Sequence, residues 1–156
     1  MSAPLWSGVG GAAKARSESR WLSLMILEEK NVRAISARAR RLAKDLREVC
    51  GLLVDHGGLV ALVETRNKSR RRCSFWIHPA DWKNVERAAG VLGSRVVGTF
   101  HSHMASDPVP GTGDLRGAVS GHAMIILDAA TGELRAWRIR RGRAYRLRHR
   151  FYRAAS

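Results

Sequence analysis

The chain has 156 residues, 45% of them hydrophobic and 26% charged, as in a globular protein and unlike a disordered or fibrous one. This length suits one domain with a hydrophobic core, so a single functional site is expected. The 28 Lys and Arg residues outnumber the 13 Asp and Glu residues, giving a formal net charge of +15. Such a field attracts phosphates, anionic membranes or an acidic protein, and charge alone does not choose among them.

The first residues of the chain differ in composition from the rest. Residues 1–20 combine glycine, proline and basic residues without apolar periodicity, so we predict a disordered basic tail there and one domain over residues 21–153. The apolar run at 21–27 is too short to span a bilayer and lacks a small-residue cleavage pattern. Cys50 and Cys73 are predicted to be buried thiols in strands and not a disulfide. These features predict a cytoplasmic protein.

Apolar patterns predict the elements of the first half. A strand at 22–27 precedes an amphipathic helix whose other faces are rich in solvated arginine. The apolar stripe of this helix comprises Ile35, Ala39, Leu42, Leu46 and Val49. Strands at 49–54 and 59–64 then flank residues 55–58, whose composition is typical of a hairpin turn.

The second half continues the alternation of strands and short helices. The predicted elements are a strand at 73–77, a helix from Pro79 to Gly90, a strand at 96–103, a helix from Asp114 to about Ser120, and strands at 122–128, 133–140 and 143–151. The sum predicts an α+β fold: a mixed, mostly antiparallel β-sheet of some seven strands with two or three flanking helices.

The strand predicted at 96–103 ends in a His-x-His pattern. Strand alternation places His101 and His103 on one face and Ser102 on the other, where a nucleophilic role for the serine is not expected. A loop rich in Pro and Gly then returns the chain to Asp114 at the start of a helix. Two imidazoles and one carboxylate give three protein ligands, so a Zn²⁺ ion so bound keeps a fourth tetrahedral position for water.

Glu48 lies at a predicted helix-to-strand junction, where the helix dipole disfavours an acid. Zinc-bound water has a pKa of about 7, and a nearby carboxylate that carries its proton to a departing amine typically contributes ~10²–10⁴ in rate. Ordinary alternatives exist for both acids. Asp114 is also a favourable first-turn acid, and Glu48 is also explained as a surface carboxylate paired with Arg47 or Lys44.

These residues resemble the motif of the JAMM (MPN+, Mov34/JAB) metalloprotease family, with a prokaryotic JAB-like character. The resembling segments are Glu48-Val49-Cys50-Gly51-Leu52-Leu53, Val97-Gly98-Thr99-Phe100-His101-Ser102-His103 and Gly111-Thr112-Gly113-Asp114. The likeness extends over about residues 22–137. It implies a JAB1/MPN-like fold with cytidine-deaminase-like layering. It also implies one Zn²⁺ ion held by His101, His103 and Asp114, with Glu48 as the general acid/base.

Two positions depart from the family pattern. Gly111 stands where the family has a serine that helps to stabilise the oxyanion, and Met104 stands where it usually has proline. Thr112, one place after Gly111, offers a hydroxyl group and is a candidate catalytic donor, with a helix-capping role as the alternative. Loss of one oxyanion donor costs about 10²–10³ in rate, so a slow enzyme is compatible with the change.

Two functions from different classes follow. The resemblance implies a peptidase or isopeptidase that cleaves after the C-terminal tail of a ubiquitin-like or sulfur-carrier protein. The alternative is a catalytically weak or silent scaffold of the same fold, which binds an acidic protein or nucleic acid through its basic surface. Arginines alternate with other residues over 137–151, which predicts one sheet face lined with arginine and suits either a binding role or plain solubility.

Overall fold

The computed structural model describes residues 23–155, so the tail predicted for residues 1–20 lies outside the described residues. Over this range the chain forms seven strands and three helices. In chain order they are β1 (Leu24–Glu28), α2 (Glu29–Ala43), β2 (Cys50–His56), β3 (Leu59–Thr65), α3 (Pro79–Val91), β4 (Arg95–His103), α4 (Thr112–Gly117), β5 (Ala123–Asp128), β6 (Leu134–Arg140) and β7 (Arg143–Tyr152). Within residues 23–155, helices long and apolar enough to cross a lipid bilayer are absent.

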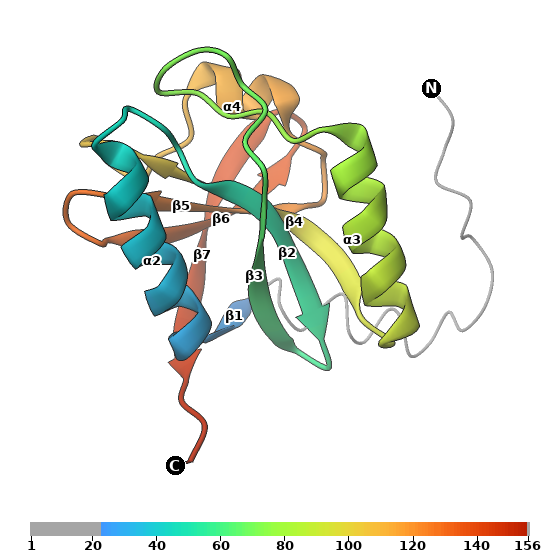
Figure 1. Cartoon of the computed structure of the whole chain (residues 1–156). Coiled ribbons are helices and arrows are strands. Elements are labelled where there is room, and N and C mark those ends of the chain that lie inside the picture. Colours follow the sequence, from blue (N-terminus) through green and yellow to red (C-terminus); the bar gives the residue numbers. More distant parts are fainter. Residues whose placement is uncertain (1–22, 156) are drawn as a thin grey trace.

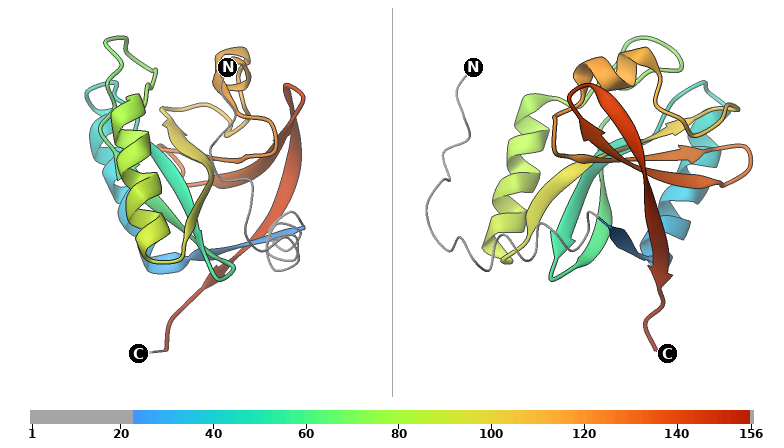
Figure 2. Two further views of the ribbon diagram at one scale, coloured as in Figure 1. Left: turned by 90° about the vertical axis from the view of Figure 1, so that its right-hand side faces the viewer. Right: turned by 180° about the vertical axis from the view of Figure 1, so that it is seen from behind.

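The seven strands close into a barrel in the order β1-β3-β2-β4-β5-β6-β7. β1 closes the barrel because it pairs in parallel with both β3 and β7. The rear view in Figure 2 shows β7, in red, running from beside α4 to the end of the barrel where it meets β1. Closure leaves none of these seven strands with an unpaired edge. The mixed sheet with helices around it is therefore confirmed, but the sheet is a closed barrel and not an open layer flanked by helices.

One apolar core fills the barrel, and α2 takes part in it. Figure 1 shows α2 and α3 on opposite sides of β2 and β3. The buried stripe of α2 comprises Val32, Ile35 and Ala39, which belong to the same cluster as the strand residues. β5 is buried on both faces: Ile125 lies in this core, whereas Ile126 belongs to a second, smaller cluster against which Leu115 of α4 packs. This packing fixes the short helix α4 over β5.

α2 ends earlier than the predicted helix. It begins at Glu29 and ends at Ala43, so Leu46 and Val49 of the predicted stripe lie beyond it. Leu46 adopts a left-handed backbone conformation with φ of 54°, and such a residue does not continue a right-handed helix. The chain then extends toward β2. Glu48 consequently lies between a helix and a strand, as predicted.

The predicted strand at 73–77 is wrong. This segment is a loop that makes one isolated bridge, between Asn67 and Ile77. Cys73 has a positive φ of 51°, which interrupts an extended strand, and it is exposed instead of buried. The Asn67 side chain replaces a partner strand here, because it donates to the carbonyl of Ser74 and accepts from the amide of Trp76. Both cysteines are free, as expected.

The arginines of the last hairpin do not share one face. The β6–β7 register pairs Trp137 with Arg146 and Arg138 with Tyr145, so Arg138 and Arg146 point to opposite faces. The prediction of a single arginine-lined face is wrong for the two strands together. Each strand alternates as expected, but alternation within a strand does not determine its register across a turn.

Candidate metal centre and catalytic pocket

β4 ends in two histidines whose side chains point the same way. β4 lies between β2 and β5, with His101 opposite Cys50 and Ile126, so His101 is fully buried. His103, at the end of the strand, is partly exposed. The Nε2 atoms of the two imidazoles lie 3.2 Å apart. The strand therefore presents the pair of imidazoles that its alternation predicts.

Asp114 joins the two histidines from the first turn of α4. This helix begins at Thr112, two residues before the predicted start, and ends at Gly117. Asp114 Oδ1 lies 3.3 Å from His101 Nε2, and Asp114 Oδ2 lies 3.5 Å from His103 Nε2. The amide of Gly111 also donates to Oδ2 at 2.8 Å. One carboxylate thus serves both as a first-turn helix acid and as a partner of the imidazoles.

The three donor groups fit a divalent metal ion. One ligand atom from each lies within 4.8 Å of the others, and in the described part of the chain this is the one such group of His, Cys, Asp or Glu. A tetrahedral Zn²⁺ with bonds of about 2.0–2.1 Å needs donors about 3.3–3.4 Å apart. The observed separations of 3.2, 3.3 and 3.5 Å match that requirement. Three protein donors leave a fourth position free for water or substrate.

Contacts behind the cluster orient His103. Its Nδ1 lies 2.9 Å from the carbonyl oxygen of Asp107, which directs Nε2 toward the cluster. The Asp107 loop is itself held by Trp137, whose indole N–H donates to the carbonyl of Pro108 at 2.9 Å. Two hydrogen bonds therefore link β6, through the loop that contains Asp107, to the candidate ligand His103.

His101 is held by packing. Its ring stacks on Phe75, with ring centroids 4.3 Å apart and planes 19° from parallel. Its Nδ1 is buried and lacks a hydrogen-bond partner within residues 23–155. The contribution of Phe75 was missed from the sequence, because the segment that contains it was taken for a strand. The signal available was a pair of adjacent aromatic residues, Phe75 and Trp76, directly after a basic loop.

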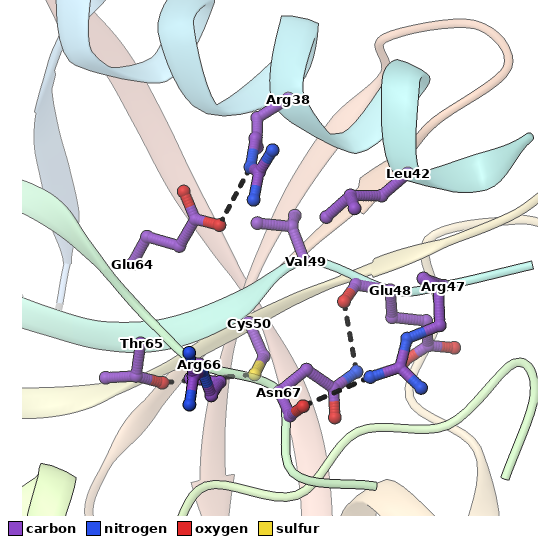
Figure 3. A pocket seen from close by; sticks show the side chains of 10 residues that line it. All are labelled: Arg38, Leu42, Arg47, Glu48, Val49, Cys50, Glu64, Thr65, Arg66 and Asn67. Atoms are coloured by element: carbon purple, nitrogen blue, oxygen red, sulfur yellow. Dashed lines mark hydrogen bonds and ion pairs between the residues drawn. The ribbon is translucent and has the colours of Figure 1, made fainter. Parts of the chain in front are cut away.

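Glu48 is buried beside this cluster, with only 6% of its surface exposed. The amide of Val49 donates to Ser102 Oγ at 2.9 Å and the amide of Ser102 donates to the carbonyl of Val49 at 3.0 Å, which joins the Glu48 segment to the histidine strand. Asn67 Nδ2 donates to the carbonyl of Glu48 at 3.0 Å (Figure 3). The alternative of an exposed Glu48 paired with Arg47 is excluded by this burial, and the Arg47 guanidinium donates to backbone carbonyls instead.

Burial and mutual contacts shift the pKa values of all four groups. Burial raises the pKa of Glu48 to about 7, with His103 opposing and Asp114 adding to the effect. Burial lowers the pKa of His101, whereas the hydrogen bond with Asp114 raises the pKa of His103. Burial disfavours the charge on Asp114, but hydrogen bonds with the two histidines outweigh it and hold its pKa well below the usual range. An ionised Asp114 and a neutral His101 are the forms that bind a metal ion.

A pocket of about 510 Å³ opens beside Glu48 and Asp114. Residues 73–77 form one wall, with Trp76 exposed at its surface. The α4 wall consists of small residues besides Asp114: Gly113, Gly117 and Ala118. Small residues on one side leave room for a polypeptide backbone to approach the cluster.

The other candidate residues lie outside the cluster. Thr112 is exposed in the first turn of α4 and is not among the residues that line the pocket, so its catalytic role stays a prediction. The remaining histidines are engaged elsewhere, as expected: His56, His78, His122 and His149. Neither Cys50 nor Cys73 belongs to the cluster.

The cluster predicts metal binding that depends on its three donors. Purified protein should retain about one zinc ion per chain, and His101→Ala or Asp114→Asn should lose it. Asp114→Asn is the milder test, because it preserves side-chain shape. His56→Ala, at an exposed histidine, is the control. Elemental analysis gives the stoichiometry, and a chelator should lower the Tm of the wild type but not of the two site variants. Equal zinc contents in all four proteins would refute the assignment.

The raised pKa of Glu48 predicts a pH-dependent stability difference in the metal-free protein. Below the ordinary pKa of 4.5 the carboxyl is protonated in both the folded and the unfolded states, so burial carries no ionisation penalty. The penalty grows as pH rises and is complete above about 7. Glu48→Gln should therefore increase the free energy of unfolding most above pH 7 and least near pH 4.5, as measured by urea unfolding. A difference that stays constant across this range would contradict the burial effect.

Comparison with known proteins gives the family. A desampylase of Pyrococcus furiosus is 29% identical over 116 residues, which cover 74% of this chain and 81% of that protein. Protein DSY2949 of Desulfitobacterium hafniense is 20% identical, with a TM-score of 0.70 over 84% of this chain and 94% of that one. A Salinibacter ruber protein is 23% identical, with a TM-score of 0.57 over 80% of this chain and 91% of that one. These two structures show a shared fold.

The profile of the family described as prokaryotic homologs of the JAB domain matches residues 28–140. This range spans most of the chain and contains Glu48, His101, His103 and Asp114. The chain therefore belongs to the prokaryotic JAB family.

Proposed function

We propose that the protein is a zinc-dependent peptidase or isopeptidase, which hydrolyses the bond after the C-terminal tail of a ubiquitin-like or sulfur-carrier protein. The observation that carries this proposal is the buried Glu48 beside a three-donor cluster that leaves one position free. Membership of the JAB family and similarity to a desampylase support hydrolysis of this type. A purely structural metal site has no use for a free position or for a carboxyl group that titrates near neutrality.

The metal donors in this proposal are His101, His103 and Asp114. When bound, the ion would polarise the scissile carbonyl and the attacking water. The hydrogen bond from His103 to the Asp107 carbonyl and the stacking of Phe75 on His101 keep both rings oriented. The protein thus supplies ligands that need little rearrangement.

Glu48 is the proton carrier. Its carboxylate accepts a proton from the attacking water, and the carboxylic acid so formed donates that proton to the nitrogen of the departing amine. In the metal-free protein burial raises the pKa of Glu48 to about 7, and this environment makes the carboxylate a better proton acceptor than an exposed one. The hydrogen bonds at Val49 and at the Glu48 carbonyl hold the backbone in place through both steps.

The pocket supports a narrow substrate tail. A tail that ends in Gly-Gly has no side chains to collide with residues 73–77 or with α4. Trp76 and Trp82 supply apolar surface along the pocket, against which the residues before such an end can pack. The bond to be cleaved then lies where Glu48 and Asp114 meet in the pocket wall.

A silent scaffold is the second candidate, and Gly111 is the residue that favours it. No hydroxyl is present where the family has its serine. However, the metal donors and the proton carrier are all retained, so we propose a slow enzyme in preference to an inactive scaffold. Thr112 stays a candidate: its hydroxyl group would act only if the bound substrate placed the oxyanion within hydrogen-bond distance of it.

Replacement of the proton carrier tests the mechanism. Glu48→Gln should lower kcat by about 10²–10⁴ while zinc content is unchanged, because the amide cannot accept the proton of the attacking water. Asp45→Asn, at an exposed acid three residues earlier, is the matched control and should retain full activity. The measurement is hydrolysis of a peptide that ends in Gly-Gly-aminocoumarin. Equal rates for Glu48→Gln and wild type would defeat the proposed role.

Gly111 offers a gain-of-function test. Its φ is −79°, and an added Cβ would meet only Asp114 Oδ2, at 3.5 Å, so a side chain is accommodated. Gly111→Ser should raise kcat by about tenfold or more with little change in KM, because it adds a hydroxyl donor. Gly111→Ala has the same Cβ without the hydroxyl and should not increase kcat. An equal response of the two variants would show that the hydroxyl contributes nothing.

A further inference from the structure

A loop beside the pocket concentrates positive charge. In residues 66–72, here called the basic loop, five of seven side chains are cationic and none is acidic. They are Arg66, Lys68, Arg70, Arg71 and Arg72, and all five are exposed. None of them forms an ion pair with any residue that the structure describes. Uncompensated like charges repel each other, so this concentration costs stability unless something binds it.

The basic loop has a fixed backbone despite this repulsion. Arg47 lies beneath it and donates to the carbonyls of Asn67 and Ser69, both at 3.1 Å. The Asn67 carboxamide accepts from the amide of Ser69 and donates to the carbonyl of Glu48. The amide of Lys68 donates to the carbonyl of Trp76. The cationic side chains therefore extend from an ordered backbone, and this lowers the conformational entropy lost when a partner binds.

The basic loop is continuous with the catalytic pocket. Residues 73–77, which follow it directly, form a wall of that pocket. All views place this loop at the same end of the barrel as α4 (Figures 1 and 2). A second hollow of about 470 Å³ lies between α2 and the beginning of the loop, and Glu48 and Arg66 are among the residues that line it. Arg38, which also lines it, is paired with Glu64 (Figure 3). A chain bound in the pocket thus emerges next to exposed positive charge.

We propose that the basic loop is the docking surface for the folded body of the substrate protein, and that the docking face of this substrate is acidic. This inference rests on the proposed function and specifies its substrate class: a protein with clustered Asp and Glu residues near a flexible C-terminal tail. The tail enters the pocket while the acidic body rests on the basic loop. Charge of this kind raises the rate of encounter and selects partners.

An acidic protein fits this surface better than a nucleic acid does. Single-stranded nucleic acids bind grooves in which aromatic side chains stack on bases, and residues 66–72 contain no aromatic residue. The cations also belong to a loop that runs directly into residues 73–77, and these residues form a wall of the pocket that takes a polypeptide tail. The β7 arginines are a less suitable docking surface because β7 contributes no residue to the pocket wall, whereas the basic loop leads directly into residues that do.

Two triple variants with equal charge change test the proposal. Arg70→Glu/Arg71→Glu/Arg72→Glu alters the basic loop, and Arg143→Glu/Arg148→Glu/Arg150→Glu alters exposed arginines of β7 as a matched control. Each lowers the formal net charge by six. The two probes are a short peptide and an acidic ubiquitin-fold protein, both ending in Gly-Gly-aminocoumarin. Circular dichroism and zinc content establish that both variants are folded.

The measured quantity is the KM for the protein probe divided by the KM for the peptide probe. The basic-loop variant should raise this ratio by about tenfold or more, whereas the β7 variant should change it by less than about twofold. The difference should shrink as NaCl rises from about 0.05 to about 0.3 M, because salt screens exposed charges. An unchanged ratio in the basic-loop variant, or equal changes in both variants, would overturn the proposal.

Two further outcomes separate this inference from its alternatives. If the basic-loop variant loses affinity for a fluorescent DNA duplex and its KM ratio is unchanged, the surface binds nucleic acid and the proposal fails. If the wild type cleaves neither probe, the proposed function fails instead. Docking is then decided by fluorescence anisotropy of the labelled acidic protein, whose Kd should weaken by about tenfold in the basic-loop variant and not in the β7 variant.

Discussion

Two hydrogen bonds between Val49 and Ser102 join the segment that carries Glu48 to the strand that carries both histidines. They extend the pairing of β2 with β4 past Cys50 and His101, the last pair of that register. Together with the hydrogen bond from Asn67 to the Glu48 carbonyl, they fix the position of the acid relative to the imidazoles. Ser102 faces away from the donor atoms, as alternation requires, and its contribution to the site is to place Glu48.

Burial in the site opposes the charges of both carboxylates, Glu48 and Asp114, and favours the neutral form of His101 that binds a metal ion. Asp114 stays ionised only because both imidazoles contact it. A bound divalent cation would offset these costs, since it neutralises the carboxylates and uses the imidazole lone pairs. A contribution to folding stability does not explain this arrangement of buried acids and imidazoles, whereas a role in metal-assisted hydrolysis does. The basic loop is a similar case at the surface: its cations repel each other, and an acidic partner would offset that repulsion when it binds.

Local patterns predicted much of the site and less of the fold. His101 and His103 follow from strand alternation, and the Pro- and Gly-rich loop and the helix-to-strand junction made Asp114 and Glu48 candidates. The family resemblance strengthened these two assignments, because a loop and a chain reversal bring both acids to the histidines. Phe75, Ser102 and Asn67 were not recognised as site residues, since their roles depend on contacts between segments distant in sequence. Sequence also missed barrel closure, which requires β1 to pair with β7 at the other end of the chain. The left-handed conformations of Leu46 and Cys73 likewise have no signature in residue type.

X-ray absorption at the zinc edge tests the central claim most directly, because it identifies the atoms bound to the ion. The account predicts a first shell of nitrogen and oxygen at about 2.0–2.1 Å, with the outer-shell scattering of two imidazoles. It also predicts that this signal is lost together with the ion in Asp114→Asn. A sulfur neighbour at about 2.3 Å, which would indicate Cys50 or Cys73, or a spectrum without imidazole scattering would contradict a centre formed by His101, His103 and Asp114.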